Sequence, residues 1–137
     1  MRVPSFTLCL AALPALAAAY SQHSNFTTQC KDVSYGNSAV LSASCLKNSN
    51  SDTGVVGSNT YTKSEFEIAL CVGIDYITAK LSYQPLGKYP NYCSDCILED
   101  SQFLKCTCQS DGLVVTSRLD LDEGVGNVNG SLACRWY

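Results

Sequence analysis

The chain has 137 residues, of which 46% are hydrophobic and 15% charged, and its formal net charge is −3. The apolar share is ordinary for a globular protein and too high for a disordered tail, and the length suits one domain. A chain with a net negative charge lacks the cationic surface that attracts phosphate backbones, so no nucleic acid is expected as a partner. The chain has a single histidine, which disfavours a zinc site built from histidines and a catalytic triad.

The first nineteen residues have the pattern of a secretory signal peptide. Arg2 supplies a positive start, residues 6–19 form an apolar run, and Ala17 to Ala19 offer the small side chains that a signal peptidase reads. The apolar run is shorter than the ~20 residues that a membrane span needs, and no second run follows. We therefore expect residues 1–19 to be removed and residues 20–137 to form a secreted, extracellular domain, with a membrane anchor as the alternative.

Eight cysteines remain after the signal peptide. They are Cys30, Cys45, Cys71, Cys93, Cys96, Cys106, Cys108 and Cys134. An even number in a secreted chain predicts a disulfide framework, although the count leaves the pairing open. A zinc ribbon is the alternative, but the second cysteine pair has one intervening residue rather than two, so we expect no metal and no other cofactor. Asn25 and Asn129 lie in sequons for N-glycosylation, which fits a eukaryotic secretory route.

The mature chain contains an internal repeat. Cys30 and Cys45 recur as Cys93 and Cys108, both shifted by the same number of positions. A later match, between residues 79–83 and 130–134, has an offset that is smaller by twelve. We expect this difference to be an insertion in the polar stretch from Asn48 to Lys63, whose composition predicts a long surface loop.

Alternation of apolar and polar residues predicts short β-strands with one face on a core and one in water. The residues expected on the inner faces are Leu41, Ala43 and Cys45, then Leu81 and Tyr83, then Leu113, Val115, Ser117, Leu119 and Leu121, and finally Leu132, Cys134 and Trp136.

The last two of these stretches are joined by a segment with two local signals. Asp120 and Glu123 have the spacing of a capping box, which predicts one helical turn that Gly124 ends. Asn129-Gly130 then supplies the two positive-φ residues of a type I′ hairpin turn. These signals favour a small all-β domain.

Three segments resemble the cyanovirin-N homology domain, a lectin family, here of the secreted eukaryotic, fungal type. Phe26-Thr-Thr-Gln-Cys30 followed by Leu41-Ser-Ala-Ser-Cys45 resembles the start of that domain, residues 117–132 resemble the end of one of its repeats, and Tyr83-Gln84-Pro85 resembles the hinge between its halves. The resemblance covers about residues 25–135. It implies an all-β, disulfide-stapled fold of two pseudo-symmetric repeats, about 25–84 and 88–137, each a three-stranded sheet plus a β-hairpin contributed by the other half.

The resemblance also implies two disulfides, Cys30 with Cys45 and Cys93 with Cys108. The other four cysteines are additional to the family pattern. Cys96 and Cys106 lie inside the second hairpin, where they fit a neighbouring rung if a bulge corrects their parity. This leaves Cys71 and Cys134 to form the fourth disulfide with each other.

By resemblance, the function is to bind mannose-rich oligosaccharides through uncharged pockets, with no catalytic activity. Amides and hydroxyls match the closely spaced hydroxyls of a sugar without charge or metal. Carried over position by position, one pocket falls on Asn25, Thr28, Gln29, Leu46, Lys47, Asn48, Asn127, Val128 and Asn129. Leu46 stands where the family has a carboxylate, and a glycan on Asn129 would lie in the mouth of this pocket.

The second family pocket falls on Asp75, Tyr76, Thr78, Gln109, Ser110 and Asp111. Tyr76 and the loss of a glycine turn depart from the family pattern there. These departures motivate an alternative function, a secreted disulfide-rich scaffold or effector that binds protein. An enzyme is the least supported class, because the tempting acidic pair, Asp122 and Glu123, is explained by helix capping. We expect a monomer, with exchange of halves between two chains at Gln84-Pro85 as the alternative.

Overall fold

The computed structural model describes residues 24–47, 60–134 and 136. The expected signal peptide and Asn48 lie outside these residues. The first repeat contains η1 (Phe26–Thr28), β1 (Cys30–Tyr35), β2 (Val40–Lys47), β3 (Thr60–Glu67), η2 (Ile68–Leu70), β4 (Val72–Ile74) and β5 (Leu81–Tyr83), where η marks a one-turn 3₁₀ helix. The second contains η3 (Tyr89–Asn91), β6 (Cys93–Glu99), β7 (Phe103–Ser110), β8 (Leu113–Asp120), η4 (Leu121–Glu123), β9 (Val125–Val128) and β10 (Ser131–Cys134). No helix within the described residues is long and apolar enough to cross a membrane.

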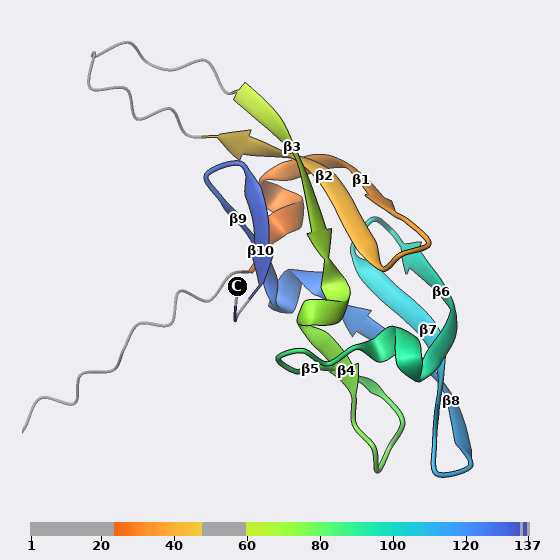
Figure 1. The fold of residues 1–137 in the computed structure, drawn as a ribbon. Helices are drawn as coiled ribbons and strands as arrows, with labels where there is room; N and C mark the ends of the chain where they lie inside the picture. The colour runs from red at the N-terminus through yellow and green to blue at the C-terminus, as the bar shows by residue number, and fades with distance from the viewer. Residues whose placement is uncertain (1–23, 48–59, 135, 137) are drawn as a thin grey trace, which may run out of the picture.

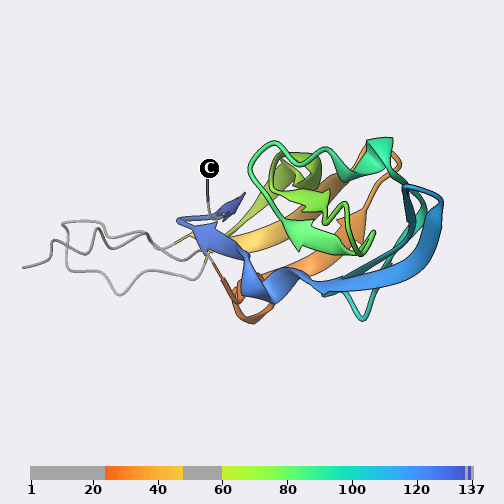
Figure 2. The ribbon, with the colours of Figure 1, turned by 90° about the horizontal axis from the view of Figure 1, so that it is seen from below.

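The two repeats exchange their hairpins (Figure 1). Each repeat has an antiparallel three-stranded sheet, β1-β2-β3 or β6-β7-β8, and a two-stranded hairpin, β4-β5 or β9-β10. Hairpin β9-β10 lies on the first sheet, where Leu132 N donates to Ser64 Oγ at 2.9 Å. Hairpin β4-β5 lies on the second sheet, where Leu81 N donates to Ser117 Oγ, also at 2.9 Å. The predicted all-β fold of two repeats is confirmed, and Figure 2 shows hairpin β9-β10 at one end and strands β6–β8 at the other.

The length difference between the repeats is divided between two places. The offset is constant from η1 through β2, where Phe26 corresponds to Tyr89 and Val40 to Phe103. It is smaller by ten at β3, where Thr60 corresponds to Leu113. Ten of the twelve extra residues therefore lie between β2 and β3, and two lie in the β4-β5 turn. The predicted end of the surface loop, Lys63, is four residues too far along the chain. Thr60 to Lys63 belong to β3 and are paired with β2.

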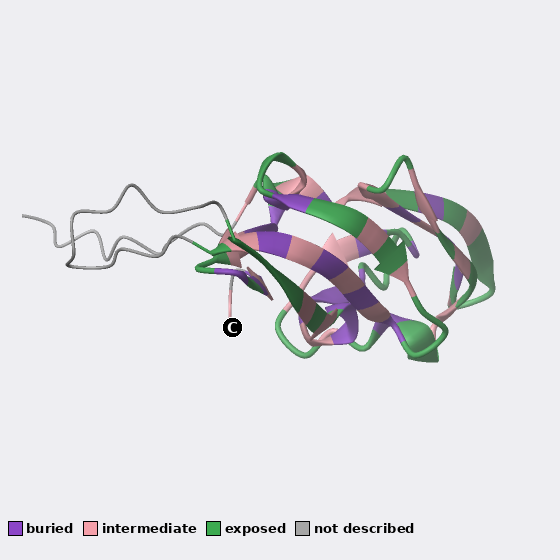
Figure 3. Cartoon of the chain, turned by 90° about the horizontal axis from the view of Figure 1, so that it is seen from above, coloured by how far each residue is buried: buried purple, intermediate pink, exposed green. Residues whose placement is uncertain are grey.

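Burial follows the predicted alternation on the central strands. Along β2, Leu41, Ala43 and Cys45 are buried between less buried neighbours, and Figure 3 shows these alternating bands. The prediction is wrong at the start of the 113–121 stretch, where Leu113 is 44% exposed, four residues along β8 from Ser117, to which hairpin β4-β5 is bonded. At the other end, Leu121 is buried as expected, in the helical turn η4.

The two local signals before β9-β10 are confirmed. The side chain of Asp120 caps η4 by accepting a hydrogen bond from Asp122 N, and Gly124 closes this helical turn. Asn129 and Gly130 have φ values of 48° and 91° and form the turn between β9 and β10. Both features depend only on neighbouring residues, which is why the sequence predicts them.

Among the described residues, four disulfides join the expected partners: Cys30 to Cys45, Cys93 to Cys108, Cys96 to Cys106 and Cys71 to Cys134. The register of β6 shifts between Ser94 and Ile97, and Asp95 has a φ of 52°. This is the bulge that the Cys96–Cys106 pairing requires. The Cys71–Cys134 bond spans 63 residues and ties the first repeat to the last strand.

Candidate functional site

Three segments from the two repeats meet at one end of the molecule. They are η1, the end of β2 and the β9-β10 hairpin, which carry the residues of the first expected pocket. Leu46 N donates to Gln29 O at 2.9 Å, which joins η1 to β2. Asn127 Nδ2 donates to Leu46 O at 2.8 Å and to Gln29 Oε1 at 3.1 Å, which joins the hairpin to both.

Asn127 has its whole amide group engaged. Besides the two bonds donated by Nδ2, its Oδ1 accepts a hydrogen bond from Gly130 N at 2.8 Å. It is therefore a positioning residue that fixes the hairpin turn against Gln29. The turn also packs closely on β2, since a Cβ on Gly130 would lie 3.2 Å from Lys47 Cβ.

The side chains around Asn127 are exposed to solvent. Thr28, Gln29, Lys47 and Asn129 are exposed, and Val128 is 45% exposed. Thr28 Oγ1 donates its proton to Asn25 O at 2.8 Å, so toward a ligand this hydroxyl acts as an acceptor. The structure thus brings eight of the nine expected pocket residues together at one surface of amide, hydroxyl and backbone groups with one cation. The ninth, Asn48, lies outside the described residues.

The residues of the second expected pocket also come together, where the β4-β5 turn meets β7. Ser110 Oγ donates to Tyr76 O at 2.8 Å and so joins the two repeats. Asp75 Oδ1 accepts from Ile77 N at 2.8 Å and from Thr78 N at 3.1 Å. The Asp75 carboxylate thereby shapes the β4-β5 turn.

An aromatic pair lies beside this turn. The rings of Tyr76 and Tyr92 are 5.5 Å apart with an interplanar angle of 78°, and their hydroxyl oxygens are 3.2 Å apart. The hydrogen bond to Tyr92 raises the pKa of Tyr76. Sequence analysis missed Tyr92 because no local spacing connects it to Tyr76, which lies on another repeat.

The acidic residues near η4 have structural roles. Thr27 donates to Asp122 from its backbone N, at 3.0 Å, and from its hydroxyl, so both carboxylate oxygens are engaged. Asp120 caps the helical turn. Within the described residues, no group of three or more His, Cys, Asp or Glu side chains could hold a metal ion.

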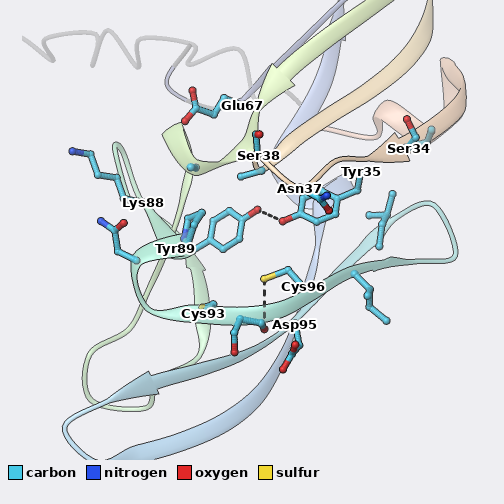
Figure 4. A pocket seen from close by; sticks show the side chains of 18 of the residues that line it. Ser34, Tyr35, Asn37, Ser38, Glu67, Lys88, Tyr89, Cys93, Asp95 and Cys96 are labelled. Atoms are coloured by element: carbon cyan, nitrogen blue, oxygen red, sulfur yellow. Dashed lines mark hydrogen bonds between the residues drawn. The ribbon is translucent and has the colours of Figure 1, made fainter.

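A hollow of about 920 Å³ lies between the repeats, away from both expected pockets (Figure 4). It is lined by the β1-β2 turn on one side and by η3 and β6 on the other. Tyr35 and Tyr89 point toward one another in it, with hydroxyl oxygens 2.7 Å apart. The sequence predictions do not include this hollow, although several residues that line it differ in kind from the residues at the matching positions of the other repeat.

Comparison with known proteins gives a consistent result. A family model described as the CVNH domain matches residues 26–133. A MoCVNH3 variant solved in complex with (N-GlcNAc)4 is 18% identical, with a TM-score of 0.66 over 81% of this chain and 97% of that chain. The CVNH protein of T. borchii is 19% identical, with a TM-score of 0.63 over 80% of this chain and 98% of that chain. GzCVNH of Gibberella zeae is 20% identical, with a TM-score of 0.63 over 80% and 96%. No curated protein matches the chain.

Proposed function

This chain belongs to the CVNH domain family, a family of carbohydrate-binding lectins, and we propose that it is a secreted lectin that binds mannose-rich oligosaccharides at the surface around Asn127. The observation that carries the proposal is the convergence of η1, β2 and hairpin β9-β10 through the hydrogen bonds of one side-chain amide. Neutral donors and acceptors at this density suit a sugar, whose hydroxyls both donate and accept.

Binding at this single surface is expected to be weak. Each neutral hydrogen bond contributes only about 0.5–1.5 kcal/mol after water is displaced. Useful avidity then needs a second site or clustered glycans. The surface around Tyr76 and Ser110 is the second candidate, joined across the repeats by the bond from Ser110 Oγ to Tyr76 O.

A protein-binding scaffold or effector is the second candidate function. It is favoured by the exposed apolar groups of the β4-β5 turn, where Tyr76 is 55% and Ile77 88% exposed. Adjoining exposed apolar side chains are typical of protein-interaction surfaces, and the aliphatic side chain of Ile77 in particular has no donor or acceptor for a sugar hydroxyl.

A glycan array followed by calorimetry with mannotriose and chitotetraose tests the lectin function and its specificity. Gln29→Ala removes one exposed amide and is expected to weaken binding about 2- to 10-fold, because one neutral hydrogen bond is lost. Asn127→Ala removes the bonds that assemble the surface and is expected to abolish binding there. Thr116→Ala, on the exposed face of β8, is the control. Binding that survives Asn127→Ala would rule out this surface as the site, and an array without any signal would favour the scaffold.

Secretion and N-glycosylation are parts of the same proposal. Asn25 and Asn129 are both exposed, as an acceptor asparagine must be. Asn129 lies in the turn beside the proposed surface, so a glycan there would compete with ligand. Intact mass of the secreted chain, before and after enzymatic removal of glycans, shows the cleavage point and the occupancy of both sequons.

A further inference from the structure

The hollow between the repeats lies where the two otherwise similar repeats differ. Its lining includes Ala39, Glu67, Ala69 and Pro90. When the elements of the two repeats are matched in order, each of these residues has a counterpart in the other repeat: Gln102, Asp120, Asp122 and Thr27.

At the other junction between the repeats, these counterparts form side-chain bridges. Thr27 donates to both carboxylate oxygens of Asp122, in one case from its backbone N at 3.0 Å. Gln102 Nε2 donates to Asp120 Oδ1 at 2.9 Å. The bridges fill the junction between the one-turn helix and the neighbouring repeat with hydrogen-bonded side chains.

The backbone at the two junctions is the same. Asn25 N donates to Asp122 O at 2.8 Å, and at the equivalent positions Lys88 N donates to Ala69 O at 2.9 Å. The difference is therefore confined to side chains. Proline has neither the N–H nor the hydroxyl of threonine, and alanine has no carboxylate, so the bridge is lost and its volume is left open.

Tyr35 and Tyr89 place hydroxyl groups in the hollow. Their counterparts by position in the opposite repeats are the apolar residues Leu98 and Phe26. Two hydroxyls joined by one hydrogen bond use only one of their two protons, so the pair keeps one O–H donor and unused lone pairs. Tyr89 is fully buried and Tyr35 is half-buried, so the Tyr35 hydroxyl is the accessible one of the pair and the Tyr89 hydroxyl holds it in place.

The rim of the hollow is mostly neutral and polar. Exposed residues of this kind that line it are Ser34, Asn37, Ser38, Asn91 and Ser94. The volume of about 920 Å³ falls in the range of roughly 300–1,000 Å³ that holds drug-sized ligands.

We propose that the hollow is an additional saccharide site, which binds a neutral oligosaccharide through the Tyr35 hydroxyl, held in place by Tyr89, and through the amides and hydroxyls of its rim. The proposal rests on the proposed lectin function but concerns a different surface. Glu67, Asp95 and Lys88 are the charged residues of the lining, so its formal charge is slightly negative and disfavours an acidic ligand.

The test is an NMR titration of the whole isotope-labelled protein with mannotriose and, separately, with chitotetraose. At least one saccharide is expected to shift the resonances of Tyr35, Tyr89 and Asn37, in addition to those of Gln29 at the end surface. Tyr35→Phe removes one hydroxyl and is expected to weaken binding in the hollow about 2- to 10-fold.

Two further variants fill the hollow. Ala69→Asp with Pro90→Thr installs the Asp–Thr bridge of the other repeat. Ser38→Trp fills the hollow from its exposed rim and places no charge in the interior. Both are expected to weaken binding there at least tenfold and to leave the shifts of Gln29 unchanged, whereas Thr116→Ala changes neither.

The outcomes separate the two proposals. Shifts at Gln29 without shifts at Tyr35 and Tyr89 would overturn the additional site and leave the lectin function standing. Shifts at Tyr35 and Tyr89 that survive in both filling variants would also overturn it. The absence of any shift with either saccharide would overturn both proposals.

Discussion

Gly87 lies with its backbone directly against that of Gly73. A Cβ on Gly87 would be 2.3 Å from Gly73 N, and a Cβ on Gly73 would be 2.8 Å from Gly87 Cα. Backbone atoms form both contacts, so no flexible side chain can move aside. The linker between the repeats is thereby held against β4.

Gly87→Ala is expected to destabilise the protein by about 3 kcal/mol, because overpacking against an unyielding backbone costs at the upper end of the usual range. Gly36→Ala is the matched control, since a Cβ on Gly36 would meet only Val40 O at 3.9 Å. The free energy of unfolding from chemical denaturation measures both. Equal losses in the two variants would contradict the close approach.

Removal of single disulfides is expected to have unequal effects. In the chain-entropy model, the cost grows with the loop that the bond closes, which spans 63 residues for Cys71–Cys134 and 10 for Cys96–Cys106. Replacing both cysteines of a pair by alanine should then cost about 4 kcal/mol for the first and about 2.7 kcal/mol for the second. A greater loss from removing Cys96–Cys106, measured by denaturation, would show that the model fails here.

Stability is expected to fall at alkaline pH. Burial, together with the nearby Asp120, raises the pKa of Tyr83, whose hydroxyl donates to Asp120 O at 2.7 Å. Burial and the hydrogen bond with Tyr35 raise the pKa of Tyr89. In the unfolded chain both tyrosines lose their protons near pH 10, while in the folded chain they keep them, so rising pH favours unfolding.

The effect of these tyrosines is fully present below pH ~10 and is lost progressively above it. Denaturation at several values between about pH 7 and pH 11 measures it. Tyr83→Phe should reduce the slope of stability against pH above pH ~10, because phenylalanine has no proton to release. An unchanged slope in this variant would show that Tyr83 is not among the groups responsible.

The sequence predicts those features whose causes are local or repeated. Asp120 caps η4 and Asn129-Gly130 forms a hairpin turn because neighbouring residues alone determine these geometries. The recurrence of the Cys30 and Cys45 spacing further along the chain locates the corresponding strands. The alternation of β2 identifies its buried face, since β2 is central in its sheet.

Features that depend on distant partners are not predictable in this way. The Tyr35–Tyr89 pair spans 54 residues, and no periodicity connects its members. The role of Asn127 changes for the same reason: by resemblance it is a pocket residue, but its contacts with Gln29 and Leu46 use its amide to hold the surface together. Leu113 is expected to be buried but is exposed, because the alternation of apolar and polar residues does not show how far along β8 the neighbouring hairpin β4-β5 reaches.

The protein is expected to be a monomer in solution. Gln84 N, Leu86 N and Lys88 N donate to the carbonyls of residues 71, 70 and 69 at 2.8, 2.7 and 2.9 Å, so the linker is bonded within its own chain. Exchange of halves between two chains must break this ladder and separate Gly73 from Gly87 before new contacts form.

Size-exclusion chromatography with light scattering should give a monomer mass that does not change with protein concentration. Pro85→Gly is expected to leave the mass unchanged, because proline has no N–H and takes no donor part in the ladder. The opposite result would be a dimer of the unmodified chain that becomes more abundant with protein concentration and disappears in Pro85→Gly. It would show that the stiffness of the proline controls assembly and that the backbone hydrogen bonds of the linker are too weak to prevent exchange.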